Sequence, residues 1–156
     1  MPQFKTKEQA YKDCKADGFF IQTEIVDIEK IKSTLKIAEE DLEAAKDGIK
    51  NKRWNPAYKL HYDVLHELVE SLLLFDKIKS INHQCLFAHL CMKHPELELS
   101  WDFFEKVRTK RNGINYYGEP VTEKDWKEIE VQINLYINTI KKGIEKKLPK
   151  EKEDNS

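Results

Sequence analysis

Hydrophobic residues recur every three or four positions along most of this chain, which is the spacing of amphipathic α-helices. The first such stripe covers residues 28–49, and charged residues fill its other faces. It could mark a coiled-coil partner surface, but its length of about three heptads favours one helix of a bundle. Its hydrophobic positions are Ile28, Ile31, Leu35, Ala38, Leu42, Ala45 and Ile49.

A broader apolar surface over residues 57–75 predicts the central and most buried helix. Asn55 suits the N-cap of this helix and Pro56 suits its first position, so we expect it to begin there. We expect it to run to about Lys79. A third helix is predicted from roughly Asn82 to Lys93, and a fourth from Ser100, as N-cap, toward Lys110.

The last helix has the clearest start. Thr122 with Asp125 three residues later forms a variant of the capping box. A regular stripe from Trp126 to Ile144 follows, and Pro149 lies where the pattern ends. The whole pattern predicts an all-α fold, an antiparallel up-and-down bundle of four to five helices over residues 28–148.

The two ends of the chain are predicted to lie outside this bundle. Residues 1–27 form an N-terminal extension, with a short helix near residues 10–16 that Gly18 stops. Phe19, Phe20, Ile21, Ile25 and Val26 are too apolar for a free tail, so we expect the extension to pack on the body. We find no convincing β-hairpin signal. Residues 149–156 are polar and are expected to be disordered.

Composition narrows the class of protein. The 156 residues are 35% charged and 40% hydrophobic, with five glycines and five prolines, which suits a single helical domain. A formal net charge of −1 gives no general attraction to nucleic acid or to a membrane.

No apolar run is long enough to span a bilayer, and the N-terminus lacks the order of a signal peptide. We therefore expect a cytoplasmic protein without membrane contact. Its cysteines, Cys14, Cys85 and Cys91, are then expected to be reduced thiols, and their odd number argues against a disulfide framework.

A group of metal-ligand residue types falls on the third predicted helix. Helical spacing divides the group between two faces, so one metal site would need a partner helix. The motif Asp63-x-x-His66 occurs without the second copy that a helical di-metal site needs. We therefore favour structural roles and predict no metal and no cofactor. The group comprises His83, Cys85, His89, Cys91 and His94.

The segment 111–118, Arg-Asn-Gly-Ile-Asn-Tyr-Tyr-Gly, stands out as a polar, glycine-hinged connection between two helical segments. It could be a binding site on a loop or simply a turn, because glycine and asparagine tolerate positive φ. Four basic residues against two acidic ones precede it over residues 101–111. The lysines also fit a solvated helix end, whereas Arg111 beside two tyrosines fits phosphate binding and base stacking. The predicted binding residues are Lys106, Arg108, Lys110, Arg111 and Asn115; the predicted catalytic residues are Arg111, Asn112, Tyr116 and Tyr117.

The chain resembles the HEPN domain family, the higher-eukaryote and prokaryote nucleotide-binding domains, as a divergent prokaryotic member. Residues 57–68 look like the long second helix of that family, and residues 78–83 are similar to its lysine-to-histidine step into the third helix. Arg111-Asn112 looks like the start of its signature, an arginine, a polar residue and then a histidine.

The resemblance implies a helical bundle that dimerises and joins two signature motifs in a cleft at the interface. Many members are metal-independent endoribonucleases, often toxins or antiviral effectors, and some work beside a nucleotidyltransferase. Such sites combine an arginine on the phosphate with a histidine for proton transfer. Here Tyr116 or Tyr117 stands where the histidine is expected, and a free tyrosine, with a pKa of about 10, is a poor base.

We therefore expect a homodimer that binds nucleotide or RNA through the Arg-Asn-x3-Tyr-Tyr motif. The missing histidine favours a non-catalytic role over a degenerate endoribonuclease. The alternative is an interaction or scaffold protein that partners a nucleotidyltransferase or another protein. His61 or His66 could approach Arg111 only through tertiary packing.

Overall fold

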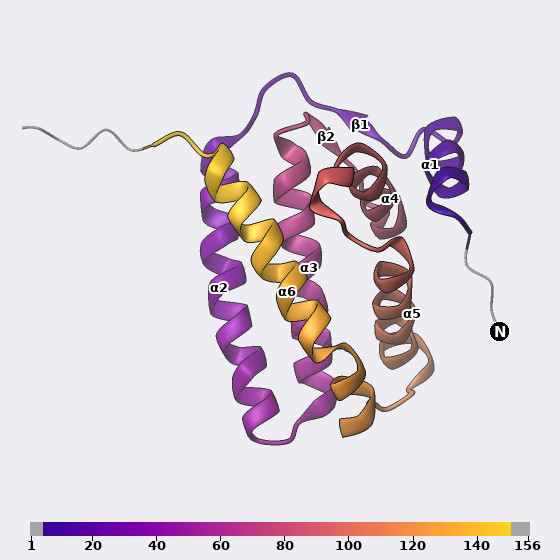
Figure 1. Cartoon of the computed structure of the whole chain (residues 1–156), viewed down its shortest axis with the longest axis vertical. Helices are drawn as coiled ribbons and strands as arrows, with labels where there is room; N and C mark the ends of the chain where they lie inside the picture. The colour runs from indigo at the N-terminus through magenta and orange to yellow at the C-terminus, as the bar shows by residue number, and fades with distance from the viewer. Residues whose placement is uncertain (1–4, 151–156) are drawn as a thin grey trace, which may run out of the picture.

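A computed structural model describes residues 5–150 of the chain, and it confirms the all-α bundle (Figure 1). Five α-helices fall within residues 28–148, and a sixth lies in the N-terminal extension. The α-helices are Lys7–Ala16 (α1), Ile28–Lys50 (α2), Trp54–Leu74 (α3), His83–Lys93 (α4), Trp101–Tyr117 (α5) and Glu123–Lys147 (α6). The remaining elements are the strands Ile21–Gln22 (β1) and Ile78–Lys79 (β2) and the 3₁₀ helix Pro95–Leu97 (η1).

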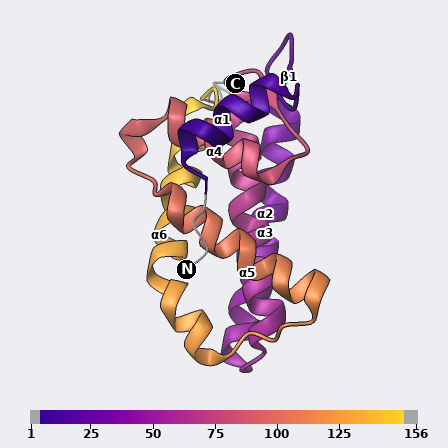
Figure 2. The same cartoon turned by 90° about the vertical axis from the view of Figure 1, so that its right-hand side faces the viewer.

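Helix α3 occupies the centre of the bundle, as its broad apolar surface predicts. It packs against α2, α4, α5 and α6. In Figure 1, α2 lies on one side of α3, α4 and α5 lie on the other, and α6 crosses in front of it. The long helices α2, α3, α5 and α6 alternate in direction along the chain, and α5 crosses the others at a tilt (Figure 2). The fully buried large side chains of α3 include Tyr58, Tyr62, Leu65, Leu68, Leu72 and Leu73.

The ends of α3 differ from the expectation. The helix begins at Trp54, and its N-cap residue Arg53 makes no side-chain cap. Asn55 is not the cap, because its Oδ1 accepts a hydrogen bond from the backbone N–H of Val121 at 2.6 Å. The helix ends at Leu74, before Lys77 takes a left-handed φ of 60°, and therefore stops short of Lys79.

The predicted caps of the other helices hold. Asn82 accepts from the backbone N–H of Cys85 at the start of α4, and Ser100 accepts from that of Phe103 at the start of α5. Thr122 forms the capping box at the start of α6. No helix among the described residues is both long and apolar enough to cross a membrane.

The N-terminal extension packs on the body through α1 and a two-stranded antiparallel sheet. Helix α1 is longer than expected and ends before Gly18, whose φ is +69°. Strand β1 then pairs with β2, with Ile21 opposite Lys79. These strands are far apart in sequence, so no hairpin pattern could reveal their pairing. Phe20 packs on Tyr11 and His89 as expected.

Other apolar residues of the extension are not packed as predicted. Phe19, Ile21 and Ile25 are exposed, and Ile25 is 76% accessible. The disorder predicted for the C-terminal tail lies outside the described residues from position 151 onward.

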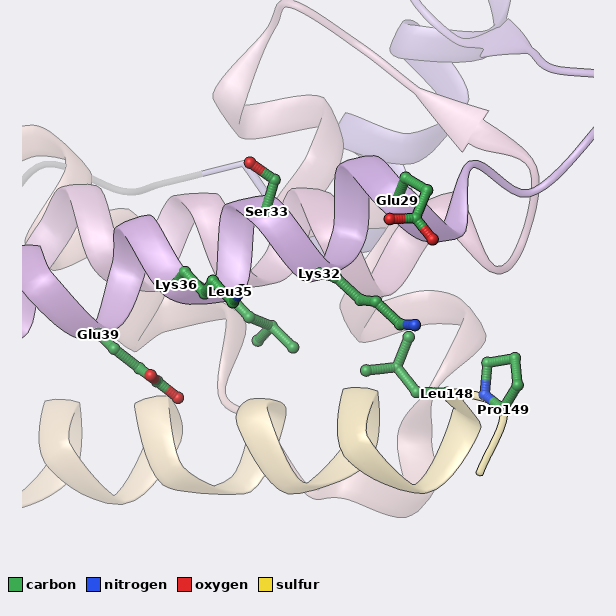
Figure 3. Close-up of a pocket in the computed structure, with 8 residues that line it drawn as sticks. All are labelled: Glu29, Lys32, Ser33, Leu35, Lys36, Glu39, Leu148 and Pro149. Atoms are coloured by element: carbon green, nitrogen blue, oxygen red, sulfur yellow. The ribbon is translucent and has the colours of Figure 1, made fainter. Parts of the chain in front are cut away.

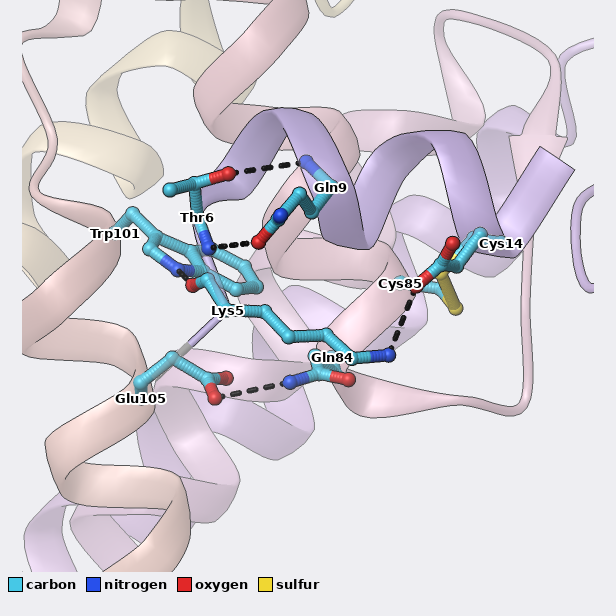
Figure 4. A network of polar contacts seen from close by, with 9 residues as sticks. Lys5, Thr6, Gln9, Cys14, Gln84, Cys85, Trp101 and Glu105 are labelled. Carbon is cyan, nitrogen blue, oxygen red and sulfur yellow. Dashed lines mark hydrogen bonds and ion pairs between the residues drawn. A yellow bond between two sulfur atoms is a disulfide. The ribbon is translucent and has the colours of Figure 1, made fainter. Parts of the chain in front are cut away.

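A disulfide corrects the expectation of reduced thiols. Cys14 of α1 is bonded to Cys85 of α4, and only Cys91 is free. Nearby, the Trp101 indole N–H donates to the backbone carbonyl of Lys5 at 2.7 Å, so α1 is held at both ends (Figure 4). Disulfides persist mainly in oxidising compartments. Because Cys14 and Cys85 are bonded to each other, the cysteines do not support the predicted cytoplasmic location.

Candidate functional site

The segment 111–118 is not a loop. Helix α5 continues through it to Tyr117, and Gly118 is the C-cap, with a left-handed φ of +62°. Gly113 lies within the helix, where glycine costs only about 1 kcal/mol. A Cβ at Gly113 would lie 2.6 Å from Glu119 Oε2, so the glycine makes room for the Glu119 side chain. The residues predicted on a flexible connection therefore lie on a rigid helix.

A polar pocket of about 460 Å³ opens between the start of α4 and the second half of α5. Its lining contains two arginines and, among the described residues, no carboxylate. The first backbone N–H groups of α4 have no acceptor within the helix, which gives this end a partial positive charge. The pocket is therefore suited to an anion. It is lined by Ile81, Asn82, His83, Gln84, Arg108, Arg111, Asn112 and Tyr116.

Arg111 is held above α3. Its guanidinium group lies 5.3 Å from the ring centroid of Tyr62, and Nη2 lies 3.5 Å from Oδ1 of Asp63. This ion pair is too long to be a strong hydrogen bond. The guanidinium group is thus kept in place by α3 without being fully committed to a protein partner.

Arg108 is fixed by a buried carboxylate. Its Nε and Nη2 donate to the two oxygens of Glu105 at 3.0 and 2.9 Å. Gln84 Nε2 donates to the same carboxylate at 2.9 Å, which joins α4 to α5 (Figure 4). This bidentate geometry sets the orientation of the guanidinium group next to Arg111.

Two histidines come together beside Arg111. The rings of His66 and His83 stack with their centroids 3.7 Å apart. His83 Nδ1 lies 2.9 Å from the Tyr62 hydroxyl oxygen. Burial, with the positive charges of Arg111 and Arg108, lowers the pKa of His83. Burial is also the main cause that lowers the pKa of His66, to about 3, so both rings are neutral at neutral pH.

Sequence reasoning found part of this pocket. Arg108, Arg111, Asn112 and Tyr116 line it as predicted. The exposed side chains of Asn115 and Tyr117 do not line it.

The two lysines predicted to bind lie elsewhere. Lys106 is 3.8 Å from Glu128, and Lys110 is 3.3 Å from Asp125. Both line a separate cavity of about 250 Å³ that also contains three carboxylates. This acidic lining leaves the lysines paired within the protein, so they are not part of the arginine pocket.

The sequence did not assign His83 and Tyr62 to this site, and only packing brings them to Arg111. His66 does approach through packing, as the sequence allowed. His61 does not, because its Nδ1 bonds the Ala57 carbonyl and its ring packs on Trp126. His83 stood out in the sequence as a member of the metal-ligand group and as the end of the lysine-to-histidine step over residues 78–83.

The predicted metal-ligand group is dispersed in the fold. Cys85 is in the disulfide, Cys91 is buried as a free thiol, and His83 lies in the pocket. Within residues 5–150, no group of three or more His, Cys, Asp or Glu side chains is arranged to hold a metal ion.

The last two members of that group, His89 and His94, flank Asp76. Their Nε2 atoms lie 3.2 and 2.6 Å from its Oδ2. Burial alone would raise the pKa of Asp76, but the hydrogen bonds from both rings hold it well below its usual range. The bond to Asp76 is also the main cause that raises the pKa of His94. This cluster ties α4 to the turn after α3.

A larger groove of about 670 Å³ lies between α2 and the end of α6 (Figure 3). Its charged side chains are of both signs, because Glu29 and Glu39 lie on either side of Lys32 and Lys36 along α2. In Figure 3 these side chains are spread along α2 and do not converge on one point. The groove is larger than the arginine pocket but offers no matching set of groups for one ligand.

No protein-family model and no curated protein matches this chain. Its function is therefore inferred from the chemistry of the arginine pocket and from the resemblance in the sequence.

Proposed function

We propose that the chain is a HEPN-like domain whose arginine pocket binds the phosphate groups of RNA or of a nucleotide. The observation that carries this proposal is the convergence of Arg108, Arg111 and the first turn of α4 on one pocket without a lining carboxylate. Arginine binds phosphate through paired N–H donors, and a helix start adds backbone donors.

The rim of the pocket favours a nucleic acid over a bare phosphate. Tyr116 is 71% accessible and Ile81 is 93% accessible, and both line the opening. An exposed tyrosine beside a cationic groove can stack a base while the backbone contacts the arginines. Single-stranded RNA fits this arrangement best, because its bases are free to stack.

The proposal includes a homodimer, as the resemblance implies. Tyr117 is 76% accessible at the end of α5, where a second copy could cover it while Tyr116 stays free for a base. Light scattering on the protein without RNA tests this part, and a monomer at all concentrations would remove it.

The binding site is tested by a fluorescence-anisotropy titration of a labelled single-stranded RNA of mixed sequence. Arg111→Ala should weaken binding by about tenfold, the effect of losing a charge-assisted phosphate contact of roughly 1.4 kcal/mol. The slope of log K against log salt should also become shallower by about one phosphate contact.

Lys141→Ala is the matched control. It removes one positive charge from α6, where Lys141 pairs with Glu39 of α2 beyond the pocket. This variant should bind RNA as the wild type does. Equal binding by wild type and Arg111→Ala, or the absence of RNA binding by the wild type, would refute the proposed site.

A further inference from the structure

The cavity of about 250 Å³ that Lys106 and Lys110 line is formed where α3, α5 and α6 meet. It shares no lining residue with the arginine pocket. Figure 1 shows the connection from α5 to α6, which borders this cavity, at the lower end of the bundle. A cavity of this size is smaller than the sites that hold drug-sized ligands, so it suits a small metabolite.

The charges of this cavity are divided between two walls. Lys106 and Lys110 come from α5, whereas Glu119 follows α5, and Asp125 and Glu128 come from α6. The ion pairs across the cavity are loose, with Lys106 Nζ 3.8 Å from Glu128 and Lys110 Nζ 3.3 Å from Asp125. Charge-assisted hydrogen bonds are shorter, at about 2.7–2.9 Å. The charged groups of both walls are therefore available to a ligand that enters between them.

Tyr58 on α3 adds a buried polar group that has no protein partner. The residue is only 1% accessible, yet it lines the cavity. Its hydroxyl makes no hydrogen bond within residues 5–150. Burial raises the pKa of Tyr58, and the charges of Asp125 and Glu128 add to this, so the hydroxyl stays protonated. Because buried polar groups are nearly always hydrogen-bonded, this hydroxyl indicates a ligand in the cavity.

The two walls restrict the charge of that ligand. An anion would meet three carboxylates, and a simple cation would meet two ammonium groups. A small zwitterion instead places each of its charges against the wall of opposite sign. A hydroxyl group on the third side can donate a hydrogen bond to a carboxylate or accept one from an ammonium group.

We propose that this cavity binds a free amino acid. The carboxylate of the ligand lies toward Lys106 and Lys110, its ammonium group lies toward Glu119 and Glu128, and the Tyr58 hydroxyl makes a hydrogen bond to it. The site is separate from the arginine pocket and does not depend on RNA binding.

The test titrates free glycine, L-alanine, L-serine, L-threonine and L-valine, one at a time, into ¹⁵N-labelled protein. We expect saturable binding of at least one, with the largest amide shifts at residues 106–110, 119 and 125–129, which border the cavity. The N-acetyl and methyl ester derivatives of that amino acid each lack one charge. Each derivative should bind more weakly by about tenfold or more, because it loses hydrogen bonds between charged groups.

Tyr58→Phe tests the buried hydroxyl while it keeps the packing of the ring. This variant should bind the amino acid about tenfold more weakly, the effect of losing one hydrogen bond to a charged group. Tyr11→Phe is the matched control, because Tyr11 lies on α1 and does not line the cavity. It should bind as the wild type does. Arg111→Ala should also bind as the wild type does, because Arg111 lines the other pocket.

Three results would overturn this proposal. They are the absence of saturable binding at the named residues, equal binding of the amino acid and its two derivatives, and equal binding by Tyr58→Phe and wild type. If Tyr58→Phe does not fold, the derivatives decide the question on the wild-type protein. Failure here leaves the proposed RNA binding intact, because the two sites use different residues.

Discussion

Glu67 on α3 has a carboxyl oxygen, Oε2, that is buried and makes no hydrogen bond within residues 5–150. Burial raises its pKa to about 7, and the nearby carboxylates of Asp41, Asp63 and Glu70 add to this. A carboxyl group without a partner in such a setting holds its proton more tightly in the folded state than in the unfolded state. Ionisation of this group therefore opposes folding as the pH rises.

We predict that Glu67→Gln stabilises the protein in a pH-dependent way. The folded pKa of about 7 lies above the ordinary 4.5, so the favourable contribution of this carboxyl is present below 4.5 and lost as the pH rises through 7. After discounting for solvent exposure, the gain in unfolding free energy should be about 1 kcal/mol near pH ~8 and close to zero near pH ~4. Urea unfolding at both pH values measures it, and an equal effect at the two would contradict this account.

At the residue scale, the sequence revealed only half of the site. Arg108 and Arg111 could be found because their charge stands out beside tyrosines and asparagines in one segment. His83 and Tyr62 could not, because they belong to other helices and reach Arg111 only after α3, α4 and α5 pack. Lys106 and Lys110 were wrongly included, since their acidic partners lie on α6.

At the scale of elements, helix ends were predicted well where a side chain caps its own helix. Thr122 and Asn82 do so. The prediction failed at Asn55, whose side chain binds the distant Val121. It failed again after Lys110, because packing of α5 outweighs the small cost of a glycine in a helix.

The disulfide between α1 and α4 is the element-scale feature that sequence reasoning excluded. It closes a loop over a sequence separation of 71 residues. It attaches α1 to the first turn of α4, directly after the pocket residues His83 and Gln84. Sequence could not reveal it, because pairing depends on how α1 docks and not on cysteine spacing.

We predict that the double variant Cys14→Ser, Cys85→Ser loses about 4 kcal/mol of unfolding free energy, the chain-entropy value for a loop of this size. Urea unfolding with and without dithiothreitol provides the control. The reductant should lower the stability of the wild type toward that of the variant and leave the variant unchanged. A wild type that is as stable as the double variant without reductant would show that the bond contributes nothing.

At the scale of the whole molecule, the hydrophobic stripes were enough to predict the bundle. They specify which face of each helix is buried. The structure confirms the prediction that α3 is the central helix. They do not specify which polar faces meet at the surface of the bundle. The arginine pocket arises there, because the polar start of α4 lies next to the polar side of α5.

The central claim is that RNA binds at this pocket, and amide chemical-shift mapping tests it most directly. Single-stranded RNA of mixed sequence is titrated into ¹⁵N-labelled protein. The account predicts that the largest shifts fall on residues 81–84 and 108–116, the segments that line the pocket. Largest shifts along residues 29–39 and 148–149, which line the groove between α2 and α6, would contradict it.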